Sequence, residues 1–208
     1  INGLGQDWIV ARNYFKLHAC CRYNHGALDA LAEITSTHPE VGPDAVGNIA
    51  RIDIASYDLA AELNDQAPDN MLAAKFSVPF AIATTLINGT STVEAFTLDN
   101  VRTEAIQDLT KRVFITEDPA MTAQRSDLEA RPASVKVTMT DSQTFEASNI
   151  INQGSPSDPY TTEQLRQKYD SLAIRAWSAA DAAEVHDAIM ALDQGGDTEE
   201  LRMTVLRA

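Results

Sequence analysis

The spacing of the apolar residues changes once along the chain, at a stretch rich in Gly, Ser and Pro over residues 150–160. Before this stretch, the period-two alternation typical of strands is interleaved with the three-to-four spacing typical of helices. After it we find only helical spacing. In a chain of 208 residues, this change of spacing predicts an α+β fold followed by a helical segment. In the α+β part, helices are expected to cover a small, mainly antiparallel sheet.

Local signals place the elements of the α+β part. Alternation predicts strands at 50–56 and 112–116 and a hairpin at 135–147, and helical spacing predicts helices at 26–36, 69–88 and 100–111. Asn24 is a candidate cap for the first helix. Pro79 lies inside the second, which must break near Ser77 because proline cannot donate a helical hydrogen bond. Met71 and Phe76 on this helix are expected to pack in the core.

The helical segment after residue 160 starts with a candidate capping box made by Thr161 and Gln164. A second helix is predicted to stop at Gly195, and a short third one begins near residue 198. Three helices are too few to bury themselves well, so we expect them to pack on helices outside this chain. The chain also opens like the middle of a longer protein, which suggests that an upstream helical portion is missing.

Composition excludes several classes of protein. The net charge is −14 and no basic stripe is present, which argues against nucleic-acid binding. No apolar run approaches the roughly 18 residues that suggest a membrane span. The two cysteines, Cys20 and Cys21, are neighbours, and a disulfide between neighbours is strained, so reduced thiols in a cytoplasmic protein are expected.

One segment of this acidic chain is locally positive. Residues 8–28 contain no Asp or Glu but hold the following basic and imidazole side chains: Arg12, Lys16, His18, Arg22 and His25. The segment runs into a predicted helix start, where free N–H groups and the helix dipole favour a bound carboxylate. The same dipole should lower the pKa of His25 and give a neutral imidazole that exchanges a proton near neutral pH. The alternative is solvated charge beside a packing histidine.

Three motifs resemble those of the MmgE/PrpD family and follow in the family's order. The run from Lys16 to Asp29, KLHACCRYNHGALD, is similar to a family signature in which Lys precedes a Cys-containing stretch, an Arg, Thr-His-Pro and an Asp. Residues 74–83, AKFSVPFAIA, resemble the family's Ala-x-x-Ser-x-x-Tyr helix start. The hairpin with the GSPSDP loop at 154–159 resembles the family's hairpin and its Gly-x-Pro loop.

This resemblance implies an architecture. Family members combine a large all-helical domain with an α+β lid domain, are usually dimeric, and use neither a metal nor an organic cofactor. Residues 1–15 would then end the N-terminal helical domain, 16–150 would form the lid domain, and 151–208 would return to the helical domain. The expected partners are a small polycarboxylate substrate, the N-terminal helical portion of the same enzyme and a second copy of the chain.

The resemblance also implies site residues. It makes His25 an acid/base and Lys16 a second catalytic residue that clamps a carboxylate, with Arg22, Lys75 and Ser77 in substrate binding and no metal ligand. Surface charge for Lys75 and helix capping for Ser77 are the alternatives. Two departures from the family motifs lie beside these residues: Gly26 replaces the Pro after the His, and Phe80 replaces the Tyr.

The implied activity is that of a cofactor-free lyase, a dehydratase of the 2-methylcitrate kind that abstracts a proton next to a carboxylate. Epimerisation or decarboxylation of a related di- or tricarboxylate is the alternative within the family. A third hypothesis is a non-catalytic, ligand-binding subunit that keeps the fold, and Phe80 motivates it because a hydroxyl is lost there.

Overall fold

A computed structural model describes residues 3–6, 8–125, 127 and 129–207. The chain divides into two compact units, Ile1–Pro159 and Tyr160–Ala208, and each is described by itself. The assignment of 1–15 and 151–208 to a separate helical domain stays a prediction, and residues 1, 2, 7 and 208 of these segments lie outside the described residues.

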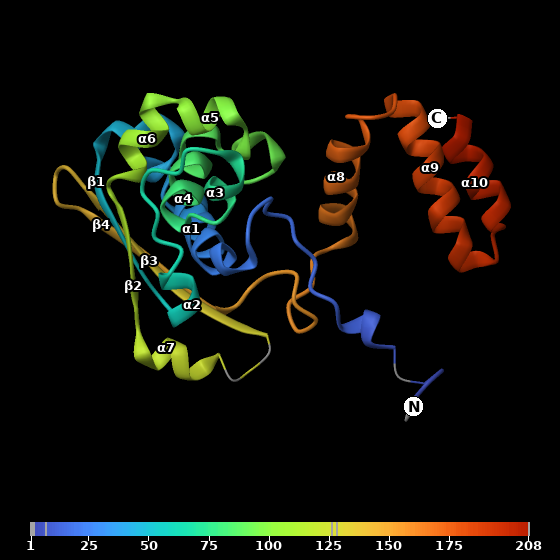
Figure 1. The fold of residues 1–208 in the computed structure, drawn as a ribbon, viewed down its shortest axis with the longest axis horizontal. Coiled ribbons are helices and arrows are strands. Elements are labelled where there is room, and N and C mark those ends of the chain that lie inside the picture. The colour runs from blue at the N-terminus through green and yellow to red at the C-terminus, as the bar shows by residue number, and fades with distance from the viewer. Residues whose placement is uncertain (1–2, 7, 126, 128, 208) are drawn as a thin grey trace. The chain divides into compact units, whose positions relative to one another are not determined.

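The first unit is built on a four-stranded sheet of order β2-β1-β3-β4 (Figure 1). The strands are β1 (Ile49–Ser56), β2 (Val113–Glu117), β3 (Ala130–Met139) and β4 (Thr144–Ile151). β1 pairs with β2 in parallel, whereas β1 with β3 and β3 with β4 are antiparallel. The predicted α+β class with a mainly antiparallel sheet is confirmed.

Helices precede the sheet, fill the crossover from β1 to β2 and connect β2 to β3 (Figure 1). The α-helices of this unit are α1 (His25–Thr37), α2 (Asp58–Ala61), α3 (Met71–Lys75), α4 (Val78–Asn88), α5 (Leu98–Arg102), α6 (Glu104–Thr110) and α7 (Pro119–Gln124). Short 3-10 turns lie at Ile9–Arg12, Arg22–Asn24, Pro39–Val41, Pro43–Asn48 and Val93–Phe96.

The core forms where the apolar face of α1 meets the sheet and α4. Leu28, Leu31 and Ile34 recur at helical spacing on α1 and are buried with residues of β1 and β3. Burying one such side chain stabilises the fold by about 1.5–3 kcal/mol. This packing fixes α1 on β3 and β4, and it therefore fixes the position of His25, the first residue of α1.

The break at Pro79 is confirmed. Residues 69–88 form α3 and α4, and Pro79 lies in the first turn of α4, where its missing N–H costs nothing. The hydroxyl of Ser77 caps α4 by accepting the N–H of Phe80 at 2.9 Å. Gly89 ends α4 in a left-handed conformation, with φ of 65°.

Two local expectations were wrong. Met71 and Phe76 are each 49% exposed, because α3 has only five residues and buries only Ala74. Asn24 does not cap α1. Its side-chain amide instead donates to the backbone carbonyl of Lys75 at 3.1 Å, so it ties the start of α1 to the end of α3.

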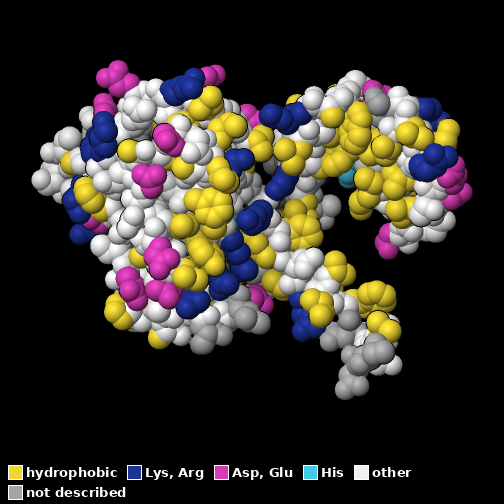
Figure 2. Space-filling model, in the orientation of Figure 1, with side chains coloured by type: hydrophobic (Ala, Val, Ile, Leu, Met, Phe, Trp, Pro, Cys, Tyr) yellow, Lys and Arg dark blue, Asp and Glu magenta, His cyan; other side chains and the backbone are white. Residues whose placement is uncertain are grey.

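The second unit contains α8 (Thr162–Ala173), α9 (Ala179–Ala191) and α10 (Thr198–Arg207). The capping box of Thr161 and Gln164 is confirmed. Figure 2 shows hydrophobic side chains gathered on this unit. Its exposed large apolar side chains are Leu172, Ile174, Ile189, Met190, Met203, Val205 and Leu206. This exposure agrees with the expectation that three helices do not bury themselves. Within the described residues, every helix is too short or too polar to span a bilayer.

Candidate active site

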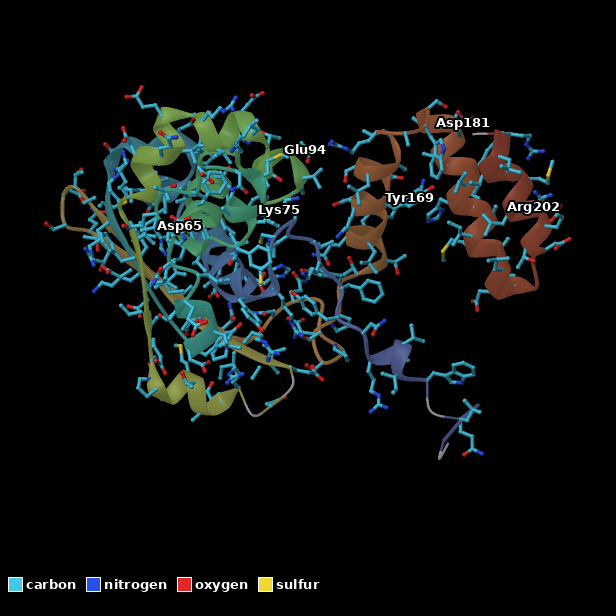
Figure 3. The ribbon with its side chains drawn as sticks, in the orientation of Figure 1. Asp65, Lys75, Glu94, Tyr169, Asp181 and Arg202 are labelled. Carbon is cyan, nitrogen blue, oxygen red and sulfur yellow. The ribbon has the colours of Figure 1, made fainter. Side chains whose placement is uncertain are left out.

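The segment before α1 is held in place by backbone hydrogen bonds to two distant loops and to the last residue of α3. The N–H groups of Phe15, Ala19 and Cys21 donate to the carbonyls of Gly154, Ser91 and Lys75 at 3.0, 2.9 and 3.0 Å. The segment therefore lies across the first unit beside the end of α3, where Figure 3 labels Lys75. This docking brings the predicted residues of the first two motifs together.

His25 is fully buried, and both of its ring nitrogens have partners. Nε2 lies 3.4 Å from the backbone carbonyl of Cys20, and Nδ1 lies 2.6 Å from the hydroxyl of Tyr14. Because a carbonyl only accepts, Nε2 carries the hydrogen and Nδ1 accepts from Tyr14. The imidazole of His25 is therefore neutral, and the lone pair of its Nδ1 accepts the hydrogen bond from the Tyr14 hydroxyl.

His18 lies next to this pair and is oriented by its own bonds. Its Nε2 is 2.9 Å from a carboxylate oxygen of Asp29, and its Nδ1 is 2.5 Å from the hydroxyl of Ser91. The ring packs edge-on against His25, with centroids 4.8 Å apart. The other oxygen of Asp29 accepts the backbone N–H of Gln153 at 3.2 Å. His18, expected to join the positive segment, does so.

The surroundings lower the pKa of His25 to about 2. Burial is the largest cause, and His18, Lys16 and Arg22 add to it, while the bond to the Cys20 carbonyl opposes it. The imidazole is neutral, as predicted, but the main cause is burial and not the helix dipole. With a pKa near 2, His25 alone does not take up a proton near neutral pH. Its chemistry must therefore run through the hydroxyl of Tyr14.

This lowered pKa predicts a dependence of stability on pH. Between about pH 6.5 and pH 2 the unfolded chain binds a proton at His25 that the folded chain excludes, so the contribution of His25 to stability is complete above pH 6.5 and is lost as the pH is lowered toward 2. The slope is at most about 1.4 kcal/mol per pH unit. Urea midpoints from about pH 7 to about pH 5 should fall less in a His25→Gln variant than in the wild type. Equal falls would contradict the assignment.

Two predicted lysines lie near the same segment. Lys16 Nζ is 3.4 Å from the carbonyl of Cys20, and both Lys16 and Lys75 lie close enough to Cys20 to lower the pKa of its thiol. Burial outweighs them and raises the pKa of Cys20 to about 12. Cys20 is therefore a protonated packing residue. Cys20 and Cys21 are both free thiols.

Arg22 links the segment to the sheet. Its guanidinium stacks over the ring of Tyr14, with 4.0 Å between its Cζ and the ring centroid, and one Nη lies 3.5 Å from the carbonyl of Glu129. Burial and then Arg131 lower the pKa of Arg22. Tyr14 thus contacts Arg22 through its ring face and His25 through its hydroxyl.

The contacts of Ser77 and Phe80 stabilise the fold. The Ser77 hydroxyl caps α4 and donates to the carbonyl of Asp65 at 2.5 Å, so it fills the capping role that was the alternative. Phe80 is 1% exposed and packs beside Phe96, with ring centroids 6.2 Å apart. Substrate binding by Ser77 stays a prediction, and no step below uses it.

The structure therefore gathers Lys16, Arg22, His25 and Lys75 around residues 14–25, and adds two residues that we did not predict. Tyr14 lies in the acid-free window, but no spacing signal distinguished it from a packing aromatic residue. Arg131 lies far along the chain in β3, so only the tertiary fold reveals its position. In the part of the chain that the structure describes, no three His, Cys, Asp or Glu side chains cluster in a way that could hold a metal ion.

Comparison with known proteins places this site in a family. A family model described as "MmgE/PrpD C-terminal domain" matches residues 18–194. A cis-aconitate decarboxylase of Aspergillus terreus is 23% identical over 208 residues, covering 97% of this chain and 42% of that protein. A cis-aconitate decarboxylase-like protein, oryM, of Aspergillus oryzae is 21% identical over 203 residues, covering 95% of this chain and 41% of that protein. The chain spans less than half the length of these relatives.

The family match covers the first unit from His18 onward and helices α8 and α9 of the second unit, while Tyr14 and Lys16 precede it. The α+β fold of the first unit is consistent with this match. The chain belongs to the MmgE/PrpD family.

Proposed function

We propose that the chain supplies the α+β part of a lyase that acts on a small polycarboxylate and moves a proton next to a carboxylate. The observation that carries the proposal is the Tyr14–His25 pair, joined at 2.6 Å beside Lys16 and Arg22. A protein of net charge −14 gathers these cations in a segment without Asp or Glu from 8 to 28. Such a site suits an anionic ligand.

The proposed chemistry follows from what each group can do. Reactions next to a carboxylate develop negative charge, which fixed cations and a hydrogen-bond donor stabilise. Tyr14 would donate or take the proton at its hydroxyl, and the neutral His25 would hold that hydroxyl and accept from it. His25 and Tyr14 would therefore act as one acid/base unit, in which the Tyr14 phenol carries the proton and the His25 imidazole positions it by accepting its hydrogen bond.

Decarboxylation of cis-aconitate is the first reaction to test, because both relatives carry that activity in their names. In that reaction a carbon–carboxylate bond breaks, CO₂ leaves, and the carbanion takes a proton, which Tyr14 would give. Dehydration of a hydroxy-tricarboxylate such as 2-methylcitrate instead removes a proton from carbon and expels hydroxide. Epimerisation is the third reaction of this chemical kind. All three require one positioned proton carrier.

The proposal includes the rest of the enzyme. The chain would act with an N-terminal helical portion of the same protein and as a homodimer, without a metal or organic cofactor. The exposed apolar residues of α8, α9 and α10 support a helical partner, since isolated helices with such faces are unstable in water.

The test is an assay of the complete protein with cis-aconitate and with 2-methylcitrate, following CO₂ release and the products by NMR. Tyr14→Phe is expected to lower kcat by about 100-fold or more, the usual effect of losing a general acid, with little change in KM. Tyr23→Phe is the matched control, since Tyr23 packs edge-on against Tyr57 through its ring and should keep full activity.

A non-catalytic, ligand-binding subunit is the competing function, favoured by the fully packed Phe80 at the family's Tyr position. Tight binding of citrate-like ligands by the complete protein, without turnover of either substrate, would establish it and refute the lyase.

A further inference from the structure

We propose that Arg22, Arg131 and Tyr57 form a subsite that binds one carboxylate of the ligand and adjoins the Tyr14–His25 pair through Arg22. The inference rests on the proposed function, because it names how that site holds its substrate. It assigns a role to Arg131 and Tyr57, which lie outside the three sequence motifs.

The sheet positions these residues. Tyr57 follows the last residue of β1 and is 1% exposed, and Arg131 is the second residue of the adjacent strand β3. The guanidinium carbon of Arg131 lies 6.0 Å from the ring centroid of Tyr57. Arg22 reaches the same place from the segment before α1, where Arg131 is near enough to disfavour its charged form.

Three buried donors of this cluster have no hydrogen-bond partner among the described residues: Arg22 Nε, Arg131 Nε and the Tyr57 hydroxyl. Buried polar groups are nearly always paired, because leaving one unpaired loses its hydration without compensation. Three unpaired donors in one cluster therefore indicate a missing acceptor. A carboxylate is that acceptor, since its two planar oxygens match the fork of a guanidinium.

The nearby carboxylates of the chain are engaged elsewhere. Asp58 forms an ion pair with Arg125 at 3.0 Å. The carboxylate of Glu129 accepts from the backbone N–H of Ser157 at 3.2 Å and from its hydroxyl. In the described part of the chain, no Asp or Glu lies within ion-pair distance of either Arg22 or Arg131. The counter-charge must come from outside the described chain.

Tyr14 connects the subsite to the proposed reaction. Arg22 covers the ring face of Tyr14, whose hydroxyl contacts His25. A carboxylate held between Arg22 and Arg131 would leave another part of the ligand to reach the Tyr14 hydroxyl. Lys and Arg side chains also form a band on the surface of the first unit (Figure 2). The inferred ligand class is an acid with at least two carboxylates, one held here and one at the reacting carbon.

The probe for the subsite is tricarballylate, an unreactive tricarboxylate, titrated calorimetrically into the complete protein. Arg131→Gln is expected to weaken binding about tenfold or more, the usual effect of losing a charge-assisted hydrogen bond. Arg131→Lys should restore part of the affinity, because it keeps the charge and loses the fork. Tyr57→Phe should weaken binding a few-fold. Arg51→Gln is the control, since Arg51 is exposed and bonded to Asp53.

Binding by Arg131→Gln within about twofold of the wild type, with its circular dichroism unchanged, would overturn the subsite. If that variant fails to fold, the same result with Arg131→Lys and Tyr57→Phe would overturn it. Absence of tricarballylate binding by the wild type would also overturn it. The assay needs no turnover, so its failure is distinguishable from the failure of the lyase proposal.

Discussion

Replacing His25 with alanine in the complete enzyme is expected to lower kcat by about 100-fold or more, the range found when a general acid/base is lost. The change removes the acceptor that holds the Tyr14 hydroxyl at 2.6 Å, so the phenol loses both its orientation and its proton partner. Binding should change less than kcat, because Lys16 and Arg22 remain. Steady-state kinetics with cis-aconitate, beside a urea unfolding curve, would separate lost chemistry from lost folding.

The control for this variant is His38→Ala. His38 is a partly exposed histidine whose ring packs on Phe145 and whose Nδ1 lies 3.5 Å from Glu40, and its loss should leave kcat unchanged. The double variant Tyr14→Phe, His25→Ala should be no slower than His25→Ala alone, because both residues handle one proton. Near-normal turnover of His25→Ala would remove His25 from the mechanism.

Gly26→Ala is expected to destabilise the fold by about 1–3 kcal/mol, the usual cost of overpacking. A Cβ on Gly26 would lie 2.5 Å from the backbone carbonyl oxygen of Arg131, 3.1 Å from the Cβ of Ala133 and 3.3 Å from the side-chain nitrogen of Asn152. Backbone cannot rotate out of the way, so α1 must move away from β3. That movement shifts His25 on α1, and Arg22 just before it, relative to Arg131 on β3, so both kcat and tricarballylate affinity should fall.

Gly47→Ala is the matched control, because a Cβ there meets nothing within 4 Å. This change should leave the urea midpoint unchanged or raise it slightly, since alanine lowers the conformational entropy of the unfolded chain. Equal midpoints for Gly26→Ala and the wild type would show that α1 and β3 have more room than the structure gives them.

The elements that could be predicted are those with a local signal. Alternation gave β1 and the β3–β4 hairpin, and the Pro79 break followed from the chemistry of one residue. The parallel pairing of β1 with β2 had no such signal, because it depends on a crossover of more than fifty residues. Helix 100–111 was predicted as one element and forms two, α5 and α6, with extended backbone at Thr103 between them.

The site was predictable in part. Its charge and its histidine followed from the acid-free window and the family motifs. The burial that lowers the pKa of His25 did not, because it depends on how α1 packs on the sheet. Tyr14 was missed because it lies in the acid-free window, residues 8–28, without a pattern that distinguishes it from a packing aromatic residue. Arg131 was missed because only the pairing of β3 with β1 brings it near Arg22 and Tyr57.

The three backbone bonds of Phe15, Ala19 and Cys21 have a consequence for how the site can change over evolutionary time. They attach one short segment to two loops and to the end of α3, which lie far apart in the chain. An insertion or deletion in any of these loops would therefore move Tyr14 and His25 as well. Loops usually tolerate length changes, but the lengths of these loops are constrained by the site that they hold in place. We therefore expect changes in ligand range to arise by amino-acid substitutions on α1 and β3.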